Sequence, residues 1–148
     1  MWNKSRSIVL SIFCTRLFML LVVVVVCFAS PIIRWYFSRT PNMEEYYPAF
    51  QIIVYVCAVP AMLLLILLDR LLRNIRRQAV FVPQNVTLLR AISWSCIAVG
   101  LAACAAGFCY ASFFLVAIAA AFCGLIVRVV KNVFEQAIEI KTENDYTI

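Results

Sequence analysis

Four long apolar runs divide this sequence and constrain its fold more than any other feature. The first, residues 17–33, lies between Arg16 and Arg34 and contains no charged side chain. As a helix it extends about 25 Å at about 1.5 Å per residue, close to the lower limit for crossing a bilayer. The chain has 148 residues, of which 66% are hydrophobic and 14% charged, so a soluble fold of this size could not hide its apolar surface. The sequence therefore predicts a membrane protein.

The expected membrane spans are residues 10–33, 49–68, 91–110 and 113–130. Cleavage of the first span as a signal peptide is disfavoured, because the apolar segment is too long and no A-x-A site follows it. Almost nothing separates the last two runs, so they must form a tight antiparallel hairpin. The predicted fold class is all-α: a polytopic four-helix transmembrane bundle that forms a single membrane domain over residues 1–148.

Most of the basic residues lie on one side of the predicted membrane. That side holds the N-terminus, the loop 69–90 and the tail 131–148, whereas the other side has only Arg34 and Arg39, balanced by Glu44 and Glu45. The positive-inside rule then places both termini in the cytoplasm of a multi-pass protein of the cell membrane. The net charge of +6 is explained by this orientation, so direct nucleic-acid binding need not be invoked. The basic residues in question are Lys4, Arg6, Arg16, Arg70, Arg73, Arg76, Arg77, Arg90, Arg128, Lys131 and Lys141.

Two segments next to the spans have helical patterns. Residues 69–79 place leucine, isoleucine and alanine on one arc and four arginines on the opposite arc, which predicts a basic amphipathic helix that prolongs the second span along anionic headgroups. Such a helix serves either as a membrane anchor or as a docking site for a lipid or an acidic partner. The tail is expected to continue the fourth span as a helix, with Lys131 and Glu135 as an i,i+4 pair.

Several classes of activity lack their central residues. The chain has no histidine, and its seven cysteines include no C-x-x-C pair. No Asp or Glu lies within the four expected spans, although proton-coupled transport needs a titratable group there. We therefore expect no enzyme, no cofactor and no metal site.

Small residues recur four apart in the last two spans, as in Gly100 with Cys104 and Ala120 with Gly124. This spacing allows close approach of helix backbones. Packing of the two spans on each other is the favoured interpretation, and a homo-oligomer remains the alternative.

Two segments resemble a known family. Residues 81–92 resemble the phenylalanine, asparagine and leucine-arginine pattern that precedes the third span in domain-of-unknown-function family 2975, through Phe81, Asn85 and Leu89-Arg90. Residues 143–148 resemble that family's closing glutamate-asparagine-aspartate-x-threonine-isoleucine signature. The resemblance covers essentially the whole chain and implies a small bacterial integral membrane protein of unassigned function.

The resemblance also implies a partner, because such proteins are often encoded beside a small helix-turn-helix regulator. We therefore expect a sensor that tethers this regulator to the membrane and releases it on an envelope or lipid signal. Polar groups facing the cytoplasm have no burial reason to be there, which makes them candidate contacts. The alternatives are an accessory subunit of a larger membrane complex and a small-solute transporter. The candidate contacts for partner or lipid are Arg70, Arg73, Arg76, Arg77, Asn85, Arg90, Glu143, Asn144 and Asp145.

Overall fold

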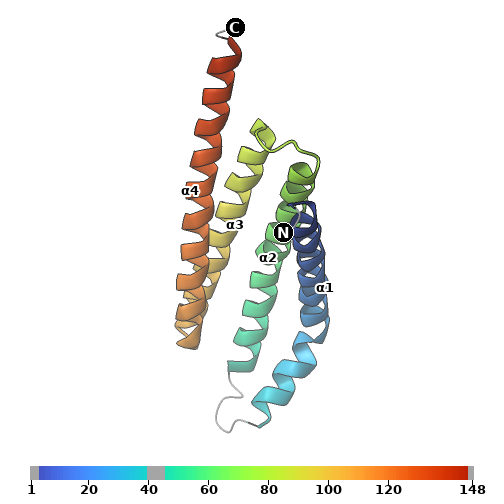
Figure 1. The fold of residues 1–148 in the computed structure, drawn as a ribbon. Coiled ribbons are helices and arrows are strands. Elements are labelled where there is room, and N and C mark those ends of the chain that lie inside the picture. Colours follow the sequence, from blue (N-terminus) through green and yellow to red (C-terminus); the bar gives the residue numbers. More distant parts are fainter. Residues whose placement is uncertain (1–3, 40–45, 147–148) are drawn as a thin grey trace.

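The computed structural model describes residues 4–39 and 46–146, which form four α-helices (Figure 1). The helices are α1 (Lys4–Phe37), α2 (Tyr47–Arg76), α3 (Pro83–Gly107) and α4 (Ser112–Tyr146). The described residues contain no strand. All four helices are long and apolar enough to cross a membrane. The prediction of an all-helical chain with four candidate spans is therefore confirmed.

Each helix is longer than the apolar run that predicted it. α2 continues through the basic segment to Arg76, and α4 continues to Tyr146. α3 begins at Pro83, as is typical of proline, because the first helical position needs no backbone N–H. The polar residues that flank the spans are therefore held on rigid helices.

The basic residues are distributed unevenly between the two ends of the molecule. One end of the molecule carries the start of α1, the end of α2, the start of α3 and the end of α4, as Figure 1 shows. We call it the basic end, because Arg6, Arg16, the arginines at 70–77 and Arg90 all lie in these segments. The opposite end has Arg34 and Arg39, at and just after the end of α1.

The helices pack in chain order. α1 packs on α2, α2 on α3 and α3 on α4, while α1 and α4 lie at opposite sides of the molecule (Figure 1). The fold is therefore an open row of four helices. α3 is the most buried helix, because it packs closely on α4 through small residues and also contacts α2. The side chains left exposed are large and apolar, such as Leu115 at 73% and Leu101 at 68%, as expected for surfaces in lipid.

The interface between α3 and α4 depends on small residues. A Cβ atom added to Gly124 would lie 3.2 Å from Cβ of Cys96 and 3.4 Å from the carbonyl oxygen of Ser93. A Cβ atom on Gly100 would lie 3.4 Å from the carbonyl oxygen of Ala117. Ser93 Oγ also donates a hydrogen bond to the carbonyl oxygen of Gly124 at 3.0 Å, which is buried between the two helices. The small residues therefore let the two backbones approach, as expected for internal packing.

Aromatic rings join the helices at the end opposite the basic end. Phe37 of α1 is buried, and its ring centroid lies 5.7 Å from that of Phe50 in α2. Phe50 in turn lies 5.4 Å from Phe113 at the start of α4. The contact of Phe50 with Phe113 joins α2 to α4, which are not neighbours in the chain order.

Gly124→Leu is expected to lower the free energy of unfolding by about 1–3 kcal/mol, because the added side chain overpacks the α3/α4 interface. The matched control is Ala119→Leu, which enlarges an exposed side chain on the same helix and is expected to change little. Thermal unfolding in mild detergent measures both variants. Equal midpoints for the two would contradict the close approach of α3 and α4.

Candidate functional site

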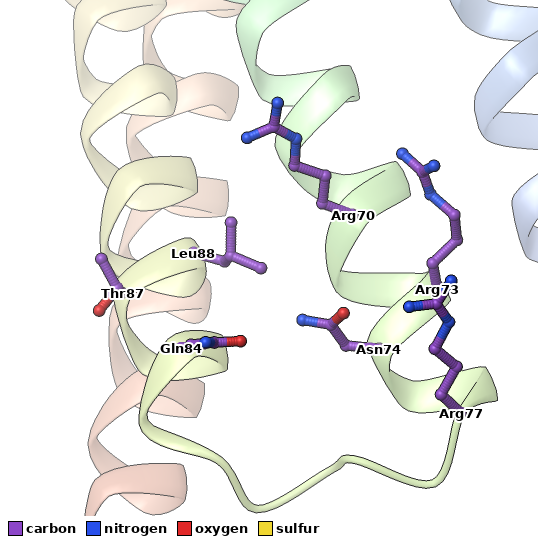
Figure 2. A pocket seen from close by; sticks show the side chains of 7 residues that line it. All are labelled: Arg70, Arg73, Asn74, Arg77, Gln84, Thr87 and Leu88. Atoms are coloured by element: carbon purple, nitrogen blue, oxygen red, sulfur yellow. The ribbon is translucent and has the colours of Figure 1, made fainter.

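A cleft of about 500 Å³ opens at the basic end between the last turns of α2 and the first turns of α3. Figure 2 shows Arg70 reaching from α2 toward α3, with Gln84 and Leu88 pointing back from α3. We call this the basic cleft, because three of its seven lining residues are arginines and none is acidic. It is lined by Arg70, Arg73, Asn74, Arg77, Gln84, Thr87 and Leu88.

The arginines of the basic cleft share one face of α2. Arg70, Arg73 and Arg77 are spaced three and four apart, whereas Arg76 lies off this face and does not line the cleft. Within the described residues, Arg70 and Arg77 have no acidic partner, so their donors are available. Guanidinium groups match the geometry of phosphate and carboxylate. The cleft is therefore suited to an anion.

A well-formed helix cap sets the floor of the cleft. The backbone N–H of Gln78 donates to the carbonyl of Ile75, and that of Ala79 donates to the carbonyl of Asn74. This pair of bonds is the Schellman pattern, in which one residue takes a left-handed conformation. Gln78 takes it here with φ 61°. The chain thus leaves α2 in a fixed direction toward α3.

Asn85 holds the α2–α3 connection in place. Its side chain is 0% exposed, and its Nδ2 donates to the carbonyl oxygens of Ala79 and Val80 at 2.8 Å each. Its Oδ1 accepts a hydrogen bond of 2.8 Å from Nδ2 of Asn74. Every polar atom of the Asn85 side chain is therefore used within the protein.

This burial corrects the argument that selected Asn85 as a contact for a partner. The side chain does have a reason to be there, because it satisfies backbone carbonyls of the connection. Arg90 is also engaged: its Nη2 lies 3.5 Å from Oε1 of Glu135, which links α3 to α4. The predicted pair of Lys131 with Glu135 is present at 2.7 Å. Asn85 and Arg90 are thus parts of the scaffold that positions the cleft.

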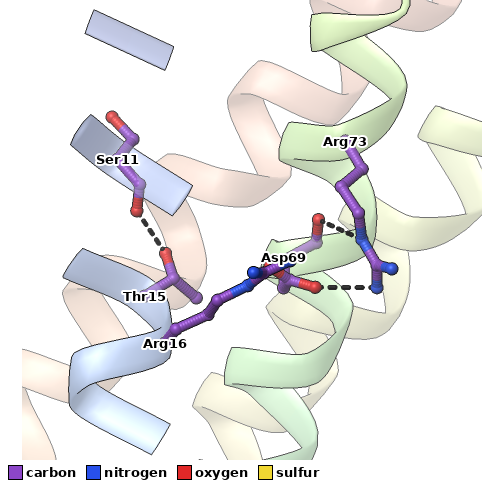
Figure 3. A network of polar contacts seen from close by, with 5 residues as sticks. All are labelled: Ser11, Thr15, Arg16, Asp69 and Arg73. Atoms are coloured by element: carbon purple, nitrogen blue, oxygen red, sulfur yellow. Dashed lines mark hydrogen bonds and ion pairs between the residues drawn. The ribbon is translucent and has the colours of Figure 1, made fainter. Parts of the chain in front are cut away.

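Asp69 joins α1 to α2 near the basic cleft (Figure 3). Its side chain is 8% exposed, and its Oδ2 lies 2.7 Å from Nη2 of Arg73. Nε of Arg16, from α1, lies 3.4 Å from its Oδ1. Beside Arg16, Thr15 is buried and donates to the carbonyl oxygen of Ser11 at 2.8 Å. Sequence reasoning treated Asp69 only as the edge of a span, although the arginine four residues later was a signal for the i,i+4 pair.

The acidic tail does not join the basic cleft. Glu143 and Asn144 lie on the last part of α4, which extends past the ends of α2 and α3 in Figure 1. Both are exposed. Asp145 belongs to the same helix, but its side chain lies outside the described residues. Of the predicted contacts, Arg70, Arg73 and Arg77 therefore line the cleft, and residues 143–145 lie at the end of α4. Arg76, Asn85 and Arg90 belong to neither group.

Four residues of the cleft were not predicted from the sequence. They are Asn74, Gln84, Thr87 and Leu88, and they line it because the Schellman turn folds α3 back beside α2. Within the described part of the chain, no group of three or more Cys, Asp or Glu side chains could hold a metal ion. The site can therefore bind by charge and hydrogen bonding.

The fold and the site define a small, all-helical membrane protein with four candidate spans and a basic cleft at one end. A family model described as "Protein of unknown function (DUF2975)" matches residues 5–148, and the chain belongs to that family. The suspected assignment is thus confirmed. No curated protein and no solved structure matches the chain.

Asn85→Ala is expected to lower the free energy of unfolding by about 2–3 kcal/mol, because it leaves the Asn74 amide and two buried carbonyls without partners. Gln84→Ala is the matched control, since Gln84 is exposed on the neighbouring position. Thermal unfolding and limited proteolysis of the 77–82 connection compare the two variants. If the Asn85 variant were as stable and as resistant to proteolysis as the control, the hydrogen bonds of Asn85 would be dispensable.

Asp69→Asn is expected to lower the free energy of unfolding by about 1–2 kcal/mol, because it leaves Arg16 and Arg73 without their carboxylate. The estimate is modest because the two arginine side chains are 62% and 50% exposed. The loss should be smaller in high salt, which screens the ion pair. Thermal unfolding at two salt concentrations measures it, with the exposed Glu139→Gln as control. No difference between the two variants at low salt would argue against the link between α1 and α2.

Proposed function

We propose that this protein is a membrane tether that binds a soluble helix-turn-helix regulator and releases it on an envelope or lipid signal. In this proposal the four helices span the bacterial cell membrane, and the basic end faces the cytoplasm according to the positive-inside rule. The role is one of binding, with no chemical reaction and no direct contact with nucleic acid.

The observation that carries the proposal is the projecting end of α4. Glu135 makes an ion pair with α3, and beyond it residues 136–146 continue as helix for about 16 Å at about 1.5 Å per residue. Figure 1 shows this end passing the ends of the other helices. Ile140 on it is 60% exposed, so it offers apolar surface to a partner. An exposed helix with apolar and charged positions is suited to docking a partner.

Charge supports a partner of the regulator type. DNA-binding surfaces are basic, and the end of α4 carries Glu139 and Glu143 close to Ile140. An acidic arm that occupies a basic surface would keep the regulator from DNA while it is held. The contacts proposed for the tether are therefore Glu143, Asn144 and Asp145 with Ile140. Arg70, Arg73 and Arg77 remain candidate contacts at the membrane, whereas Arg76 lies outside the cleft and Asn85 and Arg90 act through the scaffold.

Ile140→Glu is expected to reduce retention of the regulator at least about tenfold, since it places a charge in the centre of the proposed interface. The matched control Thr142→Glu adds the same charge to the same helix, about 200° around it at about 100° per residue. The experiment is a pulldown of the tagged full chain from mild detergent at low and moderate salt, followed by mass spectrometry.

The supporting result is a helix-turn-helix protein that is retained by the wild-type chain and by the Thr142 variant but lost with the Ile140 variant. Equal retention by both variants would contradict docking on this face of α4. Retention of membrane proteins alone would favour an accessory subunit of a larger membrane complex instead.

A further inference from the structure

One face of α2 carries an apolar stripe that leads into the basic cleft. Val59, Leu63 and Ile66 are exposed at 72%, 49% and 38%. The arginines of the basic cleft continue the same spacing of three and four residues toward the end of the helix. Side chains at this spacing lie on one side of a helix. The apolar stripe and the arginines therefore share one surface.

A groove between α1 and α2 runs along the apolar stripe. Its volume is about 540 Å³, and it is lined from α1 by residues such as Val22 and Val26. The α2 side is formed by the stripe itself. No charged residue lines this α1/α2 groove. It can therefore accept a hydrocarbon chain but not a polar molecule.

The spacing of groove and cleft matches one leaflet of a bilayer. Val59 and Arg70 are about 16 Å apart along α2 at about 1.5 Å per residue. One leaflet contributes about half of a hydrocarbon core of about 30 Å. A lipid whose chain lies in the α1/α2 groove thus carries its headgroup to the level of the basic cleft.

We propose that the α1/α2 groove and the basic cleft together bind one anionic phospholipid. The phosphate accepts hydrogen bonds from Arg70 and Arg77, which have no acidic partner among the described residues, and Gln84 completes the polar wall. Arg73 is held beside them by Asp69. An apolar groove along the same face of α2 favours a lipid over a free anion. The proposal is independent of the regulator, because no part of the projecting α4 takes part in it.

The test is native mass spectrometry of the full chain in mild detergent with phosphatidylglycerol or phosphatidylcholine of identical acyl chains. The wild-type chain is expected to retain phosphatidylglycerol about tenfold better than phosphatidylcholine. Arg70→Gln with Arg77→Gln should abolish this preference. Arg6→Gln with Arg76→Gln is the matched control, because it removes the same charge from exposed positions of the basic end outside the cleft, and it should keep the preference.

A second variant tests the groove without touching the arginines. Leu63→Trp fills the α1/α2 groove and should weaken retention of phosphatidylglycerol. Equal retention of the two lipids by the wild-type chain, or equal loss of preference in the two arginine double variants, would overturn the proposal. Displacement of phosphatidylglycerol by an equal concentration of inorganic phosphate would also overturn it, because the site would then be one for a soluble anion.

Discussion

The bilayer acts as the solvent for most of this surface, and the rest of the structure depends on that constraint. Backbone polar groups in hydrocarbon must be satisfied within each helix, so the chain forms four long helices. Lipid provides little drive for apolar side chains to leave it, so packing must come from close approach and from polar contacts. Gly100, Gly124 and Ser93 supply these between α3 and α4, and Asp69 with Arg16 supplies one between α1 and α2.

The polar residues at the basic end have two different roles. Asn85, Asp69 and Glu135 are used internally, since each forms contacts that connect one helix or turn with another. Arg70 and Arg77 have no such partner within the described residues. Asn85 makes the turn between α2 and α3 rigid, while Asp69 and Glu135 link the flanking helices, and this rigidity keeps Arg70 and Arg77 aligned without a ligand. The surrounding residues therefore hold the arginines of the candidate site in position before a ligand binds.

Hydropathy and charge were enough to predict the four helices and the contact of Lys131 with Glu135. These features depend on periodicity and on neighbours within one helix, which a single sequence records directly. The open row was not predicted, because nothing local says whether the fourth helix returns to the first. The role of Asn85 was missed for a similar reason: its partners are carbonyl oxygens, which every residue has and which only the folded turn brings together.

Packing in chain order also has a consequence for biogenesis. Most contacts between helices join a helix to the one made just before it. Each helix leaving the ribosome can therefore find its principal neighbour already in the membrane, without waiting for the remainder of the chain. Little loop-closure entropy is lost, because distant segments need not meet. α1 packs mainly on α2. Another membrane protein could therefore displace α1 from α2 with the smallest loss of contacts within the chain.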